Sequence, residues 1–162
     1  MLKLYKNIDQ KLHYWETWDK DESTGVVHWG MVGNKGESDE IRSGYLSSFR
    51  KKIQRLIDEK ITEGYGPIED DDLYTLLIEY DVDGMGTGDD LDKRHRLQGR
   101  MDETLGWTGL GHCDGGSIGS GTMEVCCIVV DFDTAFQVIQ NDLSGTEFEN
   151  YTRIFDENIK SG

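Results

Sequence analysis

The sequence predicts an α+β protein with two domains. Residues 1–68 are expected to form a small antiparallel sheet with one long helix, and residues 72–162 an acidic domain with the element order βαββαβ. Three observations favour this division. Apolar and polar residues alternate early in the chain, as in half-buried strands, and a stretch with helical apolar spacing follows. The only proline, Pro67, then precedes an acidic run, and the excess negative charge lies beyond it.

Four short strands are expected before the helix, and the third carries a tryptophan. They cover residues 2–6, 11–18, 26–32 and 37–41. Successive side chains of a strand point to opposite faces, so Val27, Trp29 and Met31 would share one face of the third strand. The glycine-rich segment 33–36 after this strand is typical of a tight turn.

The long helix is predicted from apolar residues that recur three or four positions apart. They are Leu46, Phe49, Ile53, Leu56, Ile57 and Ile61. Ser43 is expected to be the N-cap, because a serine hydroxyl can accept a hydrogen bond from a free amide of the first turn. Gly64 and Pro67 end the helix, since glycine is the common C-terminal residue and proline cannot continue it.

The acidic domain is expected to alternate strands with helices. Strands are predicted at residues 73–82, 107–112, 123–131 and 151–155, and helices at residues 91–105 and 133–143. Asp133 is the expected N-cap of the second helix. This βαββαβ order is that of a ferredoxin-like domain, in which two helices cover one face of an antiparallel sheet.

The composition favours a folded cytoplasmic protein with no membrane contact. Of its 162 residues, 36% are hydrophobic, 10% aromatic and 30% charged. Aromatic side chains bury large areas, which argues against disorder. No apolar run has the length of a membrane span, and the N-terminus lacks the apolar centre of a signal peptide. Cys113, Cys126 and Cys127 show no CxxC spacing, so free thiols in a reducing bacterial cytoplasm are expected.

The net charge of −15 is unevenly distributed. Residues 1–68 contain 11 Lys/Arg and 11 Asp/Glu, whereas residues 69–162 contain 6 Lys/Arg and 21 Asp/Glu. An acidic surface repels phosphate backbones and attracts basic partners. The one positive run of this half, residues 93–96, is expected to pair internally with nearby carboxylates.

One constellation spans residues 2–67. It is a hairpin with a WG step, a glycine-rich turn and a helix that ends in EKxxxGY, with the pieces Trp29-Gly30-Met31-Val32-Gly33, Lys35-Gly36, Phe49, Lys52, Glu59-Lys60 and Gly64-Tyr65. In order and spacing it resembles a WGR domain. The resemblance implies a small antiparallel sheet packed on one long helix. In DNA-damage-dependent poly(ADP-ribose) polymerases such a domain helps to bind broken DNA ends and relays activation to the catalytic part.

The resemblance also implies a set of candidate nucleic-acid-binding residues. They are Trp29, Arg50, Lys51, Lys52 and Arg55. Trp29 would stack on a base and the cations would contact phosphates. The motif arginine of the family falls on Met31, which has neither its charge nor its fork of donors. The alternative is that Trp29 packs on the helix and that the basic cluster is a solvated face.

The glycine-rich stretch 111–121 holds the candidate ligand or partner loop of the second domain. The candidates are His112, Cys113, Asp114, Gly115, Gly116 and Ser117. Glycines let backbone amides approach a ligand closely, but no phosphate-loop GK[ST] follows. Three interpretations stay open: a structural hairpin or β-bulge, a ligand or partner site, and a catalytic Cys113 with His112 as its base.

No cofactor, metal site or catalytic residue is assigned from the sequence. Residues 81–86 begin like an EF-hand calcium loop, with carboxylates at alternate positions and a glycine in sixth place. Met85 occupies the third ligand position and Asp92 the position of the usual glutamate. The segment is therefore interpreted as an acidic turn.

Three functional hypotheses follow. The first is a non-catalytic interaction or regulatory protein of a bacterial cytoplasm, whose acidic half binds a basic protein partner. An immunity-type protein that masks a basic nuclease is one form of it, because opposite fields speed association. The second is nucleic-acid binding through the WGR-like domain. The third is a small-ligand-binding protein or enzyme that uses the loop 111–121.

Overall fold

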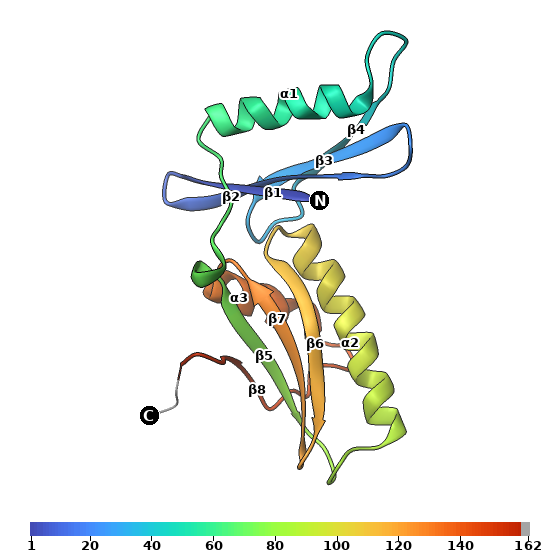
Figure 1. The fold of residues 1–162 in the computed structure, drawn as a ribbon. Coiled ribbons are helices and arrows are strands. Elements are labelled where there is room, and N and C mark those ends of the chain that lie inside the picture. The colour runs from blue at the N-terminus through green and yellow to red at the C-terminus, as the bar shows by residue number, and fades with distance from the viewer. Residues whose placement is uncertain (160–162) are drawn as a thin grey trace. The chain divides into compact units, whose positions relative to one another are not determined.

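The computed structural model describes residues 1–159, and the chain divides into two compact units. The first unit is Met1–Glu69 and the second is Asp70–Gly162, so the division falls between the two predicted domain ranges. The last three residues of the predicted second domain lie outside the described residues. Both units combine helices with antiparallel strands (Figure 1), which confirms the predicted α+β class.

The first unit is a four-stranded sheet with one helix across it. Its elements are β1 (Leu2–Ile8), β2 (Lys11–Asp19), β3 (Thr24–Met31), β4 (Glu37–Arg42) and α1 (Phe49–Thr62). The strands lie in the order β1-β2-β3-β4, and every neighbouring pair is antiparallel. Figure 1 shows α1 running along one face of this sheet.

A small apolar core lies between this sheet and α1, and Trp29 belongs to it. Its buried centre is Leu4, Trp15 and Val27. Trp29 is partly buried against this centre, together with Ile41, Leu56, Ile57 and Tyr65. Trp15 and Trp29 are directly opposite each other across β2 and β3. The strand face predicted to carry Val27 and Trp29 is therefore the face that packs on the helix.

The predicted N-cap of the long helix is wrong. The hydroxyl of Ser48, not that of Ser43, accepts a hydrogen bond from the amide of Lys51 at the start of α1, at 3.3 Å. The hydroxyl of Ser43 accepts instead from the amide of Phe49, at 2.9 Å. Leu46 precedes the helix and is 92% exposed. Its apolar spacing with Phe49 extended the periodic pattern beyond the true helix start.

On the other face of the sheet, three polar side chains form a hydrogen-bonded cluster. Nδ1 of His28 lies 2.7 Å from Oε1 of Glu16, and Nε2 lies 2.5 Å from the carbonyl oxygen of Lys35. The hydroxyl of Tyr14 donates to the carbonyl of Asn34 at 2.8 Å and lies 3.1 Å from Nε2 of His28. The turn between β3 and β4 is therefore held by side chains of β2 and β3.

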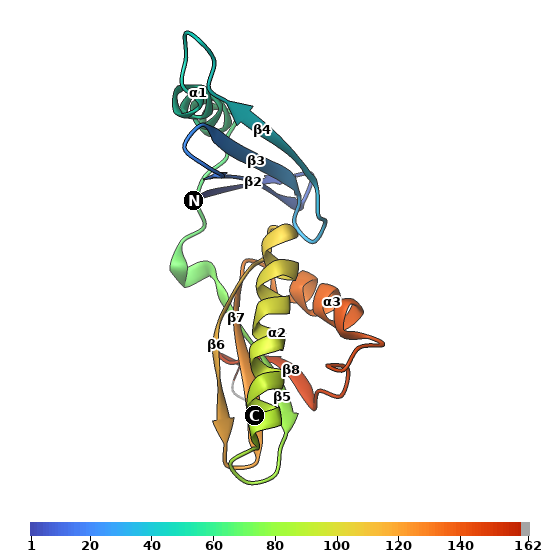
Figure 2. The ribbon, with the colours of Figure 1, turned by 90° about the vertical axis from the view of Figure 1, so that its right-hand side faces the viewer.

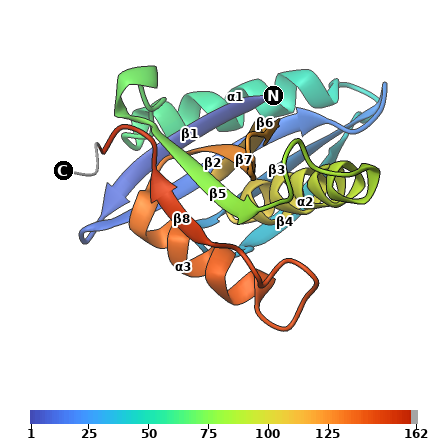
Figure 3. The same cartoon turned by 90° about the horizontal axis from the view of Figure 1, so that it is seen from below.

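The second unit has the element order βαββαβ after a short 3₁₀ turn. Its elements are η1 (Asp70–Asp72), β5 (Tyr74–Asp81), α2 (Gly88–Trp107), β6 (Gly111–Gly119), β7 (Thr122–Val129), α3 (Phe132–Leu143) and β8 (Arg153–Asp156). The antiparallel sheet has the order β6-β7-β5-β8, so β5 and β7 are central. Figure 2 shows α2 and α3 on the same side of this sheet, and Figure 3 shows β8 beside β5.

The core of the second unit lies between the sheet and the two helices. Alternate residues of β5 and β7 are fully buried on this side: Leu76, Ile78, Val125, Cys127 and Val129. The buried residues of the helices are Leu97, Met101 and Leu105 in α2 and Ala135, Ile139 and Leu143 in α3. Because side chains alternate along a strand, the remaining residues of β5 and β7 project from the opposite face.

Two predictions in this unit need correction. α2 begins at Gly88 with Thr87 as its N-cap and continues to Trp107, so the strand expected at residues 107–112 lies further along, at Gly111–Gly119. Asp131, not Asp133, is the N-cap of α3, and its carboxylate accepts from the amide of Thr134 at 3.0 Å. Both aspartates carry a capping side chain, and the choice depends on where β7 ends.

Among the described residues, no helix combines the length and the apolar composition that crossing a membrane requires.

Replacement of Tyr14 by phenylalanine should destabilise the first unit. Tyr14 is 2% exposed, and the variant leaves the carbonyl of Asn34 without its donor. We expect Tyr14→Phe to lower the free energy of unfolding by about 0.5–1.5 kcal/mol, the net contribution of one hydrogen bond, because water can reach the exposed Asn34. Urea unfolding followed by tryptophan fluorescence measures this, since Trp15, Trp18 and Trp29 lie in this unit.

Tyr45→Phe is the matched control, because Tyr45 is fully exposed. Its effect should stay within about 0.5 kcal/mol. Equal effects of the two substitutions would contradict the role assigned to the cluster.

Candidate functional site

The structure does not gather the candidate nucleic-acid-binding residues into one site. Trp29 packs in the core between sheet and helix. Arg50 forms an ion pair with Asp19 at 3.1 Å, and its guanidinium lies 4.8 Å from the ring centre of Phe49. The ammonium of Lys52 donates to the carbonyl of Arg42 at 2.9 Å. Lys51 and Arg55 are exposed on α1. The tryptophan and the exposed cations therefore do not form a common surface.

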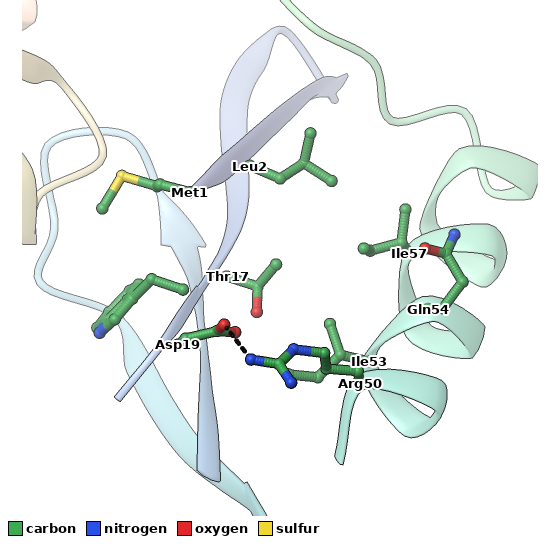
Figure 4. Close-up of a pocket in the computed structure, with 9 residues that line it drawn as sticks. Met1, Leu2, Thr17, Asp19, Arg50, Ile53, Gln54 and Ile57 are labelled. Carbon is green, nitrogen blue, oxygen red and sulfur yellow. Dashed lines mark hydrogen bonds and ion pairs between the residues drawn. The ribbon is translucent and has the colours of Figure 1, made fainter. Parts of the chain in front are cut away.

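A hollow of about 620 Å³ lies between the sheet of the first unit and α1 (Figure 4). It is lined by Met1, Leu2, Thr17, Trp18, Asp19, Arg50, Ile53, Gln54 and Ile57. Figure 4 shows the Arg50–Asp19 ion pair on its wall. The hydroxyl of Thr17 donates to the carbonyl of Val26 at 2.7 Å. Polar and apolar side chains thus line the hollow together, and the polar groups of Thr17, Asp19 and Arg50 are engaged within the unit.

Sequence reasoning missed the cluster of Tyr14, Glu16 and His28. Burial, followed by the charge of Glu16, raises the pKa of Tyr14 to about 12, so its hydroxyl remains a donor at neutral pH. His28 is 1% and Glu16 is 5% exposed. The two residues are partners in the β2–β3 register, and no pattern in the sequence indicates this pairing. All the hydrogen bonds described for this cluster lie within the first unit, and they hold the β3–β4 turn.

The candidate loop of the second unit is a bulged edge strand. β6 pairs with β7 along its length, and the register shifts between Cys113 and Gly116. Gly115, inside the bulge, has a φ of 87°. The strand ends in a two-residue turn, Ser120-Gly121, with positive φ at both residues, as tight β-hairpins favour. The glycine-rich stretch therefore forms a hairpin with a β-bulge, which is the first of the three interpretations.

The Cys113–His112 pair that the sequence left open as a catalytic pair is not formed. His112 lies opposite Ile128 and Cys113 opposite Cys127, so the two side chains occupy opposite faces of β6. The amide of Cys113 donates to Oδ1 of Asp102 at 2.7 Å. His112, Asp114 and Ser117 are exposed along the edge of the sheet.

Metal-ligating side chains are not assembled in the described part of the chain. No group of three His, Cys, Asp or Glu residues lies close enough to hold a metal ion within residues 1–159. In the segment that begins like a calcium loop, Asp90 has a structural role. Its carboxylate accepts from the amide of Thr87 at 2.8 Å, and the Thr87 hydroxyl accepts from the amide of Asp90 at 3.1 Å. This capping box starts α2.

The face of the second sheet away from α2 and α3 combines an apolar centre with surrounding carboxylates. We call it the open sheet face. The register places these apolar side chains on it: Leu77, Cys126, Ile128 and Phe155. Asp81, Glu124 and Glu157 lie around this centre, and Glu79 is buried beside Glu124 on the central strand β5. Leu77 lies opposite Cys126 on one side and Phe155 on the other, so the apolar patch crosses the centre of the sheet.

One arginine is built into the open sheet face. Nε and Nη2 of Arg153 contact Oε1 and Oε2 of Glu79 at 3.1 and 3.2 Å, and its guanidinium lies 3.8 Å from the ring centre of Phe155. Burial raises the pKa of Glu124, and a hydrogen bond with Glu79 and the charge of Glu79 raise it further. Two neighbouring carboxyl groups are thus crowded together, and a single guanidinium faces them.

Three cations of α2 have partners away from the open sheet face. Arg96 pairs with Glu147 at 2.6 Å, and Arg100 with Asp142 at 2.8 Å. Lys93 lies 4.7 Å from the ring centre of Tyr80. Within the run 93–96, Arg96 therefore pairs with a carboxylate as predicted, whereas Lys93 contacts the ring of Tyr80 and the side-chain oxygen of Asn150. None of these contacts involves a carboxylate of the open sheet face.

Comparison with protein-family models, with curated protein sequences and with solved structures finds no match to this chain. The likeness to a WGR domain therefore stays a prediction that rests on the residues of the first unit.

Removal of the Glu124 charge should stabilise the protein at neutral pH. Folding raises the pKa of the Glu124 carboxyl group above its ordinary value of 4.5. Its protonated form therefore stabilises the folded state at pH values below 4.5, and this stabilisation is lost as the pH rises through the folded-state pKa. We expect Glu124→Gln to unfold at higher urea concentration than the wild type at pH 7, with no difference at pH values below 4.5. Urea unfolding at both pH values measures this.

Glu103→Gln, on the exposed side of α2, is the matched control for the loss of one negative charge. Equal stabilisation by both substitutions at pH 7 would show that general charge repulsion, rather than the crowding beside Glu79, is responsible.

Gly116 and Gly99 should respond to alanine in opposite directions. A Cβ at Gly116 would lie 2.3 Å from the carbonyl oxygen of Glu124, whereas a Cβ at Gly99 meets nothing within 4 Å. We expect Gly116→Ala to destabilise the second unit by about 1–3 kcal/mol, because β6 must shift from β7. Gly99→Ala, inside α2, should stabilise it by about 0.5–1 kcal/mol. Thermal unfolding of both variants shows whether each substitution raises or lowers stability. A Gly116→Ala variant more stable than the wild type would refute the close approach of β6 to the carbonyl of Glu124.

Proposed function

We propose that this chain is a non-catalytic binding protein that receives a basic protein partner on the open sheet face. The observation that supports this proposal is the arrangement of carboxylates around an apolar centre on the β5–β8 sheet. Protein interfaces commonly have this form, with an apolar centre and a polar rim. The fitting partner presents lysine or arginine side chains around an apolar patch.

Charge is expected to set the rate and the specificity of this association. Residues 69–162 carry 21 acidic and 6 basic residues, so a basic partner is attracted over a distance and an acidic one is repelled. The apolar centre, with Ile128 and Phe155 half-buried, supplies surface whose burial stabilises the complex. An immunity-type protein that masks the basic surface of a nuclease is one form of this function.

A basic amphipathic peptide should bind to the open sheet face. The probe is a synthetic peptide that alternates lysine and leucine, titrated into the ¹⁵N-labelled 162-residue chain at physiological salt. We expect the largest amide shifts in β5, β7 and β8. The double variant Glu124→Lys/Glu157→Lys should weaken binding by about tenfold, because it replaces attraction at the rim with repulsion.

Asp92→Lys/Glu103→Lys is the matched control, because both residues are exposed on α2 and the change in net charge is the same. It should leave the affinity close to that of the wild type. If both double variants weaken binding equally, the peptide is attracted by the total charge alone and the assignment of the site is wrong.

A further inference from the structure

Two thiols face each other across the β6–β7 ladder. Cys113 of β6 and Cys127 of β7 are directly opposite in the register, on the side of the sheet that faces the helices. The thiol of Cys113 donates a hydrogen bond to the carbonyl of Gly115 at 3.7 Å, within the bulge. Cys126, the next residue along β7, projects from the open sheet face instead. The register therefore selects one pair from three cysteines.

The backbone geometry at this pair is the one in which cross-strand side chains approach most closely. The amide of Val130 donates to the carbonyl of Leu110 at 2.9 Å, and these residues continue the same register. Hydrogen-bonded and non-hydrogen-bonded pairs alternate along an antiparallel ladder, so Cys113 and Cys127 form a non-hydrogen-bonded pair. In agreement, the amide of Cys113 points away from β7 and donates to Asp102.

A disulfide fits this kind of pair without movement of the strands. Cα atoms of a non-hydrogen-bonded pair lie about 4.5 Å apart. Disulfides join residues whose Cα atoms are about 4.4–6.8 Å apart. A cystine at Cys113–Cys127 would enclose the bulge and the Ser120-Gly121 turn, and it would tie the edge strand to its neighbour.

The two thiols also differ in the way that stepwise oxidation requires. Cys113 is half-buried on an edge strand, and its interaction with the neighbouring Cys127 thiol lowers the pKa of the Cys113 thiol. Cys127 is fully buried, and the same interaction together with burial raises the pKa of the Cys127 thiol. Cys113 is thus the accessible thiol with the greater thiolate fraction, and Cys127 is the resolving thiol behind it.

We propose that Cys113 and Cys127 are a disulfide-forming pair that is oxidised by low-molecular-weight disulfides such as oxidised glutathione. The thiolate of Cys113 attacks one sulfur of the oxidised glutathione, forms a mixed disulfide and releases one glutathione thiolate. That thiolate takes the proton of Cys127. The thiolate of Cys127 then attacks the sulfur of Cys113 and expels the second glutathione thiolate, which takes up the proton that Cys113 released to the solvent when it ionised. The protein loses two hydrogen atoms, and oxidised glutathione gains them.

Oxidation of the 162-residue chain tests this inference. The reduced protein is incubated with oxidised glutathione, quenched with acid, denatured and alkylated, and its intact mass is measured. We expect a product that has lost two hydrogen atoms and that carries one alkyl group instead of three. The Cys126→Ser variant should form the same bond at the same rate and carry no alkyl group, whereas Cys113→Ser should form no intramolecular bond.

These variants are needed because Cys126 and Cys127 are adjacent, so fragment masses alone separate them poorly. Cys113→Ser alters a half-buried edge position and leaves the buried core intact, which protects the test from unfolding. A lasting glutathione adduct on Cys113, three alkylated thiols after oxidation, or a bond that disappears in Cys126→Ser would each overturn the proposal.

Discussion

The alternation of side chains along β7 is the constraint on which the second unit depends. Met123, Val125, Cys127 and Val129 are 0–1% exposed beneath the two helices, while the residues between them face the other way. A shift of one residue in the register would bury Glu124 and expose the core, so the pairing with β5 is strongly specified. The same alternation creates the acidic open sheet face and directs Cys127, not Cys126, toward Cys113.

Both sheets carry ionisable side chains on the face away from their core, and the two units provide these side chains with different hydrogen-bond and ion-pair partners. In the first unit, Glu16 and His28 are buried and bonded to each other and to a turn. In the second unit, Glu79 is bound by the fork of Arg153, while Glu124 is left to share its surroundings with Glu79. The first arrangement stabilises a turn, because every group has a partner. The second leaves negative charge at the surface, where a basic partner can neutralise it.

The elements with a strong local pattern were predicted well, and those without one were not. The central strands and the body of each helix follow from apolar periodicity, which a short window of sequence contains. The helix starts were misplaced: Ser48 and Asp131 cap α1 and α3, although Ser43 and Asp133 have equally suitable side chains. The strand β6 was misplaced because its glycines carry no apolar alternation, and it is held by its pairing with β7.

The sequence by itself determined the fold class, the faces of the strands and the concentration of negative charge in the second unit. These properties are local or additive, so they need no knowledge of distant contacts. Only the tertiary structure decided that Trp29 packs in a core, that Glu16 meets His28 and that Cys113 meets Cys127. Each of these contacts depends on the register between two strands. Register is set by turns, bulges and burial acting together, so the identity of a residue does not reveal which residue lies opposite it on the next strand.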